Sequence, residues 1–225
     1  LARVNVLCVD KTGTITENTM EVNGEIPMDG YDSQSMAPLK QIISDFASAM
    51  SSDNITMKAM KDYFNKPSGR KAVSVSPFSS QFKYSGAAFE DGSYVLGAPE
   101  FVLREDYDNY REQIEQYSSE GYRVLVFGIY DGVIDGKALT GKVTPLGLVF
   151  LSNPIRKEAP ETFKYFENQG VEIKVISGDN PVTVSQVALQ AGIANADNYI
   201  DASTLTTDEA IEDAVLRYTV FGRVT

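Results

Sequence analysis

The sequence predicts an α/β protein, in which a parallel sheet is interrupted by an inserted α+β domain with an antiparallel sheet. Three observations support this prediction. Residues 4–9 form a short apolar run, as a strand covered on both faces requires. Residues 148–225 alternate between helical and strand-like patterns, which favours a parallel sheet. Residues 71–97 show strands of period two with a hairpin signal at Asp91-Gly92, which favours antiparallel pairing.

The length and composition are consistent with two folded domains. The chain has 225 residues, of which 43% are hydrophobic and 23% charged, so it can bury a substantial core. Its formal net charge of −11 disfavours nucleic acid as a partner, and any phosphate ligand needs a local cationic pocket. The single cysteine, Cys8, lies in the apolar run, so we expect a small buried side chain and no disulfide.

The expected elements alternate between helix and strand only in the last part of the chain, and the middle is of another kind. After the first strand, polar turns are expected from residue 21. We assign residues 1–20 and 148–225 to one domain and residues 21–147 to the domain inserted into it. Helices are expected at 37–50, 54–64, 107–120, 157–169, 181–191 and 208–217, and strands at 71–78, 82–90, 93–97, 122–130, 142–151 and 171–176.

The two ends of the sequence suggest a fragment. It begins with Leu1 rather than methionine and ends on strand-like residues, 218–225, so we expect a longer parent polypeptide. No run of about eighteen apolar residues and no charged-then-apolar leader occurs, so the fragment itself is expected to be soluble.

Asp10 stands directly after the first expected strand, where ligands of parallel sheets bind. An aspartate carboxylate is ionised at neutral pH and can attack phosphorus to form an aspartyl phosphate. Lys11, a divalent cation and the N–H groups of a helix start can offset the repulsion between the two anions. For Asp10 alone, a turn or cap residue is the simpler interpretation, so the surrounding segment decides.

Residues 10–16, DKTGTIT, are identical to the phosphorylation signature of the P-type ATPases. These are cation pumps whose cytosolic head belongs to the haloacid dehalogenase superfamily. Five further segments resemble landmarks of this family and occur in its order: FSSQFK (78–83), GAPE (97–100), NPIR (153–156), SGDN (177–180) and FGRV (221–224). The chain is therefore identified as a member of this family, and its parallel sheet is expected to be the Rossmann-like phosphorylation domain.

The resemblance implies that Asp10 accepts the terminal phosphate of ATP and that Mg²⁺ binds the Asp10 carboxylate and the Thr12 carbonyl. Related phosphatases carry a second aspartate where this chain has Thr12. Because a hydroxyl is a poor proton shuttle near neutral pH, the aspartyl phosphate is expected to persist. The other residues expected at this catalytic site are Lys11, Thr14, Ser177, Gly178 and Asp179.

The residues after Ser177 also fit an anion site without the resemblance. Asn180 followed by Pro181 is typical of a helix start, whose N–H groups favour a negative charge. For SGDN alone, an ordinary capped turn is an equally good interpretation.

The inserted domain is implied to bind ATP and to pass the phosphate to Asp10 by domain closure. Phe78 is expected to stack on the adenine, and Lys83 and Arg123 are expected to pair with phosphates or the adenine edge. Two arginines at the edge of the phosphorylation domain are expected to reach the nucleotide on closure. The full expected set is Thr56, Phe78, Lys83, Gly97, Arg123, Arg156 and Arg223.

Three departures from the family pattern affect these expectations. Many relatives have a lysine where this chain has Leu96, and losing one charge-assisted contact weakens nucleotide binding by about 1.5 to 3 kcal/mol unless Lys83 or Arg123 compensates. Asn153 replaces an aspartate. The family's later lysine and magnesium-binding loop would lie beyond residue 225, so we expect little or no turnover from the fragment.

This sequence does not identify the transported ion, because in this family the residues that bind the ion lie in membrane helices. The chain has no histidine, whereas heavy-metal pumps place a His-Pro pair in the nucleotide domain. We therefore expect calcium or another hard cation. The expected partners are ATP and the transmembrane and actuator domains of the same parent polypeptide, with this head on the cytosolic face of a membrane.

Two alternative functions remain. A soluble phosphatase or phosphomutase of the same superfamily would hydrolyse a small phosphoester with this chain alone, but Thr12 and the FSSQFK and GAPE segments argue against it. A non-catalytic nucleotide-binding module would respond to nucleotide without ever carrying a labelled aspartate, and the incomplete site keeps that alternative open for the fragment.

Overall fold

The computed structural model describes residues 4–224. Residues 1–3 and 225, which belong to the first and last segments assigned above, lie outside the described residues. The chain divides into two compact units, described separately below. Unit 1 comprises Leu1–Thr19, Gln116–Tyr122 and Asn153–Thr225, and unit 2 comprises Met20–Glu115 and Arg123–Ser152.

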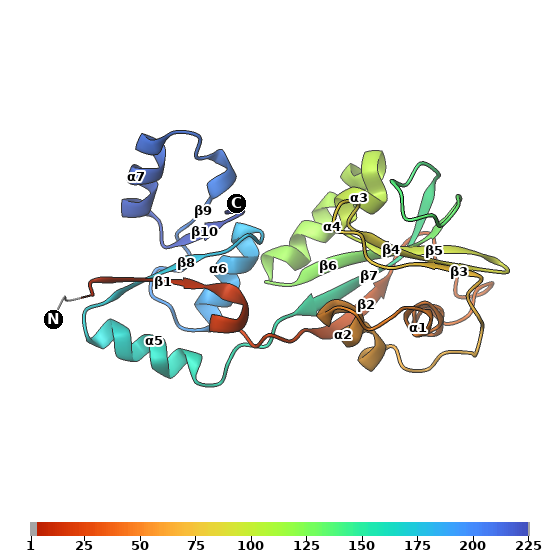
Figure 1. Cartoon of the computed structure of the whole chain (residues 1–225), viewed down its shortest axis with the longest axis horizontal. Helices are drawn as coiled ribbons and strands as arrows, with labels where there is room; N and C mark the ends of the chain where they lie inside the picture. The colour runs from red at the N-terminus through yellow and green to blue at the C-terminus, as the bar shows by residue number, and fades with distance from the viewer. Residues whose placement is uncertain (1–3, 225) are drawn as a thin grey trace. The chain divides into compact units, whose positions relative to one another are not determined.

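Unit 1 is built on a parallel sheet (Figure 1). The strand order is β1-β8-β10-β9, and all three neighbouring pairs are parallel, which confirms the predicted parallel sheet. Its strands are β1 (Val6–Asp10), β8 (Glu172–Ile176), β9 (Tyr199–Asp201) and β10 (Val220–Gly222), and its helices are α5 (Ala159–Asn168), α6 (Pro181–Gln190) and α7 (Asp208–Arg217).

Strand β1 lies at the edge of this sheet and buries one face. Leu7 and Val9 pack against the core of unit 1, which includes Val175 and Val184. The alternate residues of β1 are exposed, and Cys8 is among them. The predicted burial of Cys8 is therefore wrong, because an apolar run indicates a strand but does not show whether both of its faces are covered.

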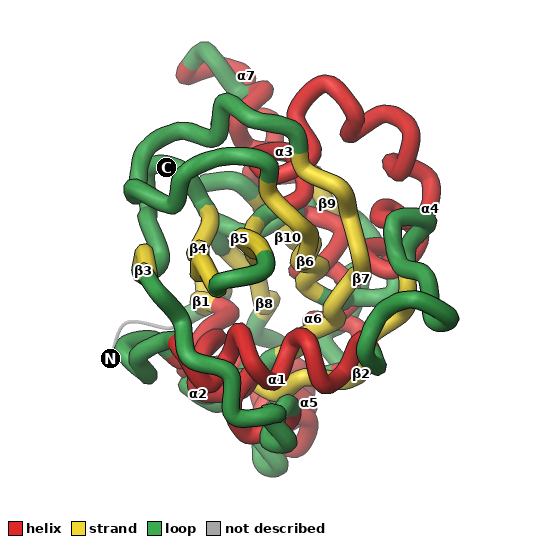
Figure 2. Tube along the Cα trace, turned by 90° about the vertical axis from the view of Figure 1, so that its right-hand side faces the viewer, coloured by secondary structure: helices red, strands yellow, loops and turns green. Residues whose placement is uncertain are grey.

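Unit 2 is an antiparallel sheet with strand order β2-β7-β6-β5-β4-β3. Helices α1 and α2 cover one face of it, and α3 packs on the other (Figures 1 and 2). The strands are β2 (Glu21–Pro27), β3 (Ser74–Ser76), β4 (Tyr84–Phe89), β5 (Gly92–Gly97), β6 (Arg123–Tyr130) and β7 (Val143–Ser152), and the helices are α1 (Leu39–Ala49), α2 (Ile55–Tyr63) and α3 (Pro99–Leu103). Helix α4 (Tyr107–Ser119) begins in unit 2, and its residues from Gln116 onward belong to unit 1.

The core of unit 2 fixes the position of helix α2 over the sheet. Phe46 of α1 packs edge-on against Phe127 of β6, with ring centroids 5.3 Å apart. Helix α2 begins at a side-chain cap, since Asn54 Oδ1 accepts a hydrogen bond from Met57 N at 2.8 Å. The first turn of α2 therefore sits at a defined place beside strands β4 to β6.

The structure corrects several element assignments. Residues 21–27 are strand β2 rather than polar turns, because the Asn-Gly pair lies at a register shift between Val22 and Gly24 instead of at a turn. The predicted strand at 71–78 shortens to β3. The predicted hairpin is confirmed, but Phe89 pairs with Gly92, so its turn is Glu90–Asp91 rather than Asp91-Gly92. Helix α3 was not expected, whereas the strand predicted at 142–151 is confirmed as β7.

Helices long and apolar enough to cross a bilayer do not occur in residues 4–224.

Candidate active site

Asp10 ends strand β1 with its carboxylate exposed. That carboxylate accepts a hydrogen bond from Lys11 N at 2.7 Å. The following turn, Lys11–Ile15, is closed by Thr16, whose N–H and hydroxyl both donate to the Lys11 carbonyl, at 3.1 and 3.2 Å. Gly13 has φ +78°, a conformation that favours glycine, although a side chain there would meet nothing within 4 Å. The turn therefore presents Asp10 at an accessible strand end.

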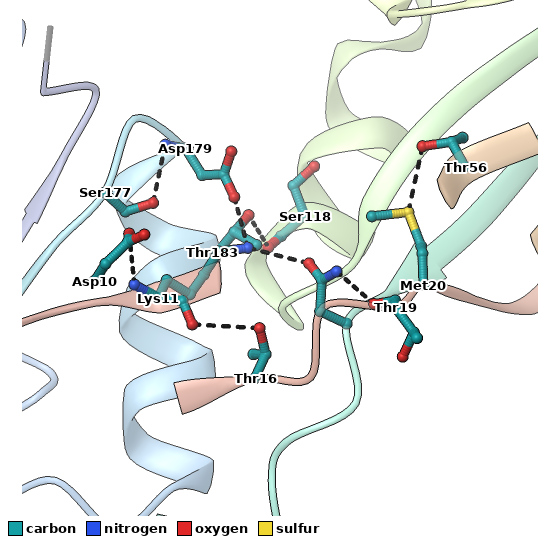
Figure 3. A network of polar contacts seen from close by, with 11 residues as sticks. Asp10, Lys11, Thr16, Thr19, Met20, Thr56, Ser118, Ser177, Asp179 and Thr183 are labelled. Carbon is teal, nitrogen blue, oxygen red and sulfur yellow. Dashed lines mark hydrogen bonds and ion pairs between the residues drawn. The ribbon is translucent and has the colours of Figure 1, made fainter. Parts of the chain in front are cut away.

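Lys11 is buried behind this turn and joins two loops (Figure 3). Its Nζ forms an ion pair with Asp179 Oδ2 at 2.6 Å and donates to Asn153 Oδ1 at 3.3 Å. The Asn153 amide in turn donates to the Thr19 carbonyl at 2.7 Å. The amine thus has one charged and one neutral partner. Asn153 bridges the amine and Thr19, the last residue of the first segment of unit 1.

The loop after β8 begins beside Asp10, because Asp10 and Ile176 are register partners in the parallel sheet. Ser177 is buried and directly follows Ile176, the register partner of Asp10; Figure 3 draws it in the loop after β8. Asp179 N donates to the Ser177 hydroxyl at 3.2 Å. Asn180 Oδ1 accepts from Val182 N at 2.9 Å and caps α6, as its sequence predicts. The positive end of the α6 dipole therefore lies in this loop.

The two arginines expected to reach a nucleotide bind groups of unit 1 in this structure. Arg156 donates to the Gly13 carbonyl at 2.7 Å and to the Thr16 carbonyl at 3.3 Å, so it braces the turn after Asp10. Arg223 pairs with Asp201 at 2.7 Å. The hydrogen bond from the Ser203 hydroxyl, together with the Arg223 charge, lowers the pKa of Asp201 below its usual range.

Unit 2 contains two adjoining cavities, of about 270 and 160 Å³. Both are lined by Asn54, Met57, Phe78 and Ser85. Phe78 is 44% exposed, so its ring is accessible from solvent at the cavity. The smaller cavity brings together four of the residues expected at the nucleotide site: Thr56, Phe78, Gly97 and Arg123.

Lys83 is not among the residues that line these two cavities. Its backbone lies beside them, because Ala98 N donates to the Lys83 carbonyl at 2.9 Å next to Gly97. Gly97 is required there by space, since a Cβ on it would lie 2.7 Å from the Tyr84 Cβ. The two strands can approach this closely only with glycine at position 97.

The floor of the smaller cavity consists of residues that the sequence did not single out. They are Met57, Ser85 and Leu125, joined by Leu96, which was singled out only for its lost charge. Ser85 and Leu96 are directly opposite each other across the β4–β5 hairpin. The hairpin signal could have placed them together, but only after its turn was located to the residue.

The residues around Asp10 suit Mg²⁺. Within the described part of the chain, no group of three or more His, Cys, Asp or Glu side chains is placed to hold a metal ion. Mg²⁺ usually takes one or two protein carboxylates, several waters and substrate phosphates, so it does not need such a cluster. The exposed Asp10 carboxylate and the Thr12 carbonyl are hard oxygen donors of the kind it prefers.

Comparison with known proteins shows the family to which this chain belongs. The sequence model of the family described as haloacid dehalogenase-like hydrolase matches residues 4–216. The calcium-transporting ATPase CtpE of Mycobacterium tuberculosis is 38% identical over 226 residues, which cover 100% of this chain and 28% of that protein. The probable cation-transporting ATPase exp7 of Streptococcus pneumoniae is 36% identical over 228 residues, with the same two coverages.

A solved structure of a zinc-transporting PIB-type ATPase in the E2.Pi state is similar to this chain with a TM-score of 0.57. The match covers 85% of this chain and 28% of that chain at 19% identity, and it supports the fold alone. This chain thus spans little more than a quarter of the length of these relatives. It belongs to the haloacid dehalogenase-like hydrolases and, among them, to the P-type ATPases.

Proposed function

We propose that this chain is the phosphorylation and nucleotide-binding part of a cation-transporting ATPase, with unit 2 as the ATP site and Asp10 as the phosphate acceptor. The observation that carries the proposal is the exposed Asp10 carboxylate at a parallel strand end, next to Ser177 and to the capped start of α6. The relative CtpE is a calcium-transporting ATPase by name, which supports calcium as the cation. The membrane and actuator parts would belong to the same polypeptide, with this head on the cytosolic side.

In the proposed reaction a carboxylate oxygen of Asp10 attacks the γ-phosphorus of ATP. The bond between that phosphorus and the bridging oxygen breaks, the aspartyl phosphate forms, and ADP leaves with the bond's electron pair. Mg²⁺ held by the Asp10 carboxylate and the Thr12 carbonyl would neutralise charge on the transferred group. The hydroxyls of Thr14 and Ser177 and the N–H of Gly178 would donate to its oxygens.

The ion pair between Lys11 and Asp179 places a cation near Asp10 without adding net charge to the site. Because Lys11 is buried, its amine stays in place without solvent competition, and Asp179 keeps the pair neutral until an anionic phosphate arrives. Thr12 offers no carboxyl group to protonate a leaving group or to deprotonate an attacking water. We therefore propose that hydrolysis of the aspartyl phosphate is slow in the absence of other parts of the protein.

At the nucleotide site, the ring of Phe78 would stack on the base, with Thr56, Gly97 and Arg123 around it. Lys83 would reach the phosphates from beside the cavity. Arg156 and Arg223 would contact the nucleotide only by leaving, or sharing, the partners they have here.

Calorimetry with ATP on Phe78→Ala tests the nucleotide site. Removing one base–aromatic stack is worth about 1 to 3 kcal/mol, so we expect ATP affinity to fall about tenfold. Phe101→Ala is the matched control, since Phe101 is 45% exposed in the same unit and does not line either cavity. Equal affinities of Phe78→Ala and the wild type would exclude this cavity as the base site.

A further inference from the structure

Ser85 is a mostly buried residue whose hydroxyl has no partner in the described part of the chain and remains accessible from the cavities that it lines. Ser85 is 3% exposed and lines both cavities of unit 2. Its side chain makes no hydrogen bond to any other residue in the range 4–224, and its oxygen is not one of the fully occluded atoms there that lack a partner. A group of this kind, facing a cavity, is placed to bond whatever fills that cavity.

The surroundings of Ser85 are apolar. Leu96 lies directly opposite it on β5, and Met57 and Leu125 complete the floor, with exposed fractions of 3%, 4% and 6%. A charged phosphate would be poorly solvated against these side chains. A planar, mostly apolar group with a polar edge suits them, because its faces gain from burial and its edge can use the hydroxyl.

The rim of the smaller cavity, unlike its floor, is exposed and includes a charged side chain. Phe78 and Arg123 are both exposed there, so a ring can stack and an anion can remain in contact with solvent and a cation. A nucleotide therefore fits with its base toward Ser85 and its phosphates toward the rim. The net charge of −11 adds to the disadvantage of burying the phosphates.

We propose that Ser85 is a specificity-determining residue, whose hydroxyl hydrogen-bonds the polar edge of the base. This inference rests on the proposed function and adds the residue that reads the ligand's nucleoside part. The Leu96 side chain, in place of a lysine, makes the floor selective for that part and leaves the phosphates to the rim.

Calorimetry of the 225-residue chain with adenosine and with ATP tests the inference. Ser85→Ala should weaken both ligands by the same factor, about tenfold, because both present the same base edge. Ser76→Ala is the matched control: Ser76 is a buried serine of the same sheet, 8% exposed, that does not line the cavities, and both affinities should stay unchanged. Lys83→Ala should weaken ATP but not adenosine.

The midpoint of thermal unfolding without ligand separates this role from a structural one. Because Ser85 has no protein partner to lose, Ser85→Ala should unfold at the wild-type temperature or above it, while a structural hydroxyl would lower that temperature. Ser85→Cys keeps the side-chain shape with a slightly larger atom, weakens the hydrogen bond and should also lower the affinity for both ligands.

Two results would overturn the inference: wild-type adenosine affinity in both Ser85 variants, or a loss confined to ATP. If the wild-type chain binds neither ligand, the proposed function fails as well, so the two failures are distinguishable.

Discussion

Lys11 shows how single side chains organise the acceptor site. Its amine is buried, yet its charged partner Asp179 keeps 53% of its side chain exposed, so the pair is desolvated on one side only. The second partner, Asn153, is an amide, and its N–H₂ can hold the Thr19 carbonyl while its oxygen accepts from Lys11. An aspartate at position 153 would have no proton to donate to Thr19 when ionised. The departure noted in the sequence therefore has a local structural use.

Gly97→Ala tests the close approach of β4 and β5 beside the cavity. The added methyl would meet the Tyr84 Cβ at 2.7 Å and the Lys83 carbonyl more closely still. Overpacking of this kind costs about 1 to 3 kcal/mol, so we expect the free energy of unfolding in urea to fall by that amount.

Gly24→Ala provides the comparison for that experiment. A Cβ on Gly24, in β2 of the same sheet, meets nothing within 4 Å, so the effect should stay within about 0.5 kcal/mol. Equal losses in the two variants would show that the cost arises from replacing a strand glycine and not from contact with β4.

At the scale of elements, the sequence patterns located most helices and strands, because alternation and helical periodicity follow directly from which face is buried. They failed at β2, where Asn-Gly sits in a bulge, and at Cys8, where a strand with an apolar sequence lies at a sheet edge. Both failures have one cause: neighbouring strands decide pairing and cover, and local sequence does not contain that information.

The sequence also predicted only some of the residues of the candidate site. Asp10 was singled out because it follows directly after an expected strand, whereas Ser177 was singled out by the family resemblance. The structure places the ends of their two strands side by side, as expected for parallel strands. Ser85 and Met57 were missed because their place in the cavity depends on the register of the hairpin and on the position of α2. The assignment of named roles came from the family resemblance and not from these patterns.

Tyr110→Phe tests how α4 is attached to the segment after β2. The Tyr110 hydroxyl donates to the Asp29 carboxylate at 2.9 and 3.0 Å, and burial with this hydrogen bond raises the pKa of Tyr110 to about 12. A raised pKa means that the folded state favours the neutral phenol. The Tyr110 hydroxyl therefore contributes fully to the free energy of unfolding below about pH 10, and this contribution disappears as the pH rises through about 12.

Urea unfolding at pH 9 and at pH 11.5 measures this contribution. The wild type should lose more unfolding free energy between these two values than Tyr110→Phe, because phenylalanine has no proton to release. The other tyrosines are common to both proteins and cancel in the comparison. Parallel profiles would mean that the Tyr110–Asp29 contact does not stabilise the folded chain.

For the whole molecule, the two units carry different parts of one proposed reaction. Unit 1 presents an acceptor carboxylate with a helix start beside it, and unit 2 presents a cavity with an apolar floor and a cation at its rim. With a net charge of −11, the chain has no general attraction for ATP, so binding depends on these local groups. The chain spans 28% of the length of CtpE and of exp7.

The most direct test of the account is acid-stable labelling from γ-³²P-labelled ATP in the full-length ATPase that the proposal implies, with Asp10→Asn beside Asp213→Asn. Asp213 is an exposed carboxylate of α7 paired with Arg217, so its variant should label like the wild type. We predict that the Asp10→Asn variant carries no label, whereas the wild type and Asp213→Asn are labelled equally. Label that persists at wild-type level in Asp10→Asn would contradict the assignment of Asp10 as the phosphate acceptor.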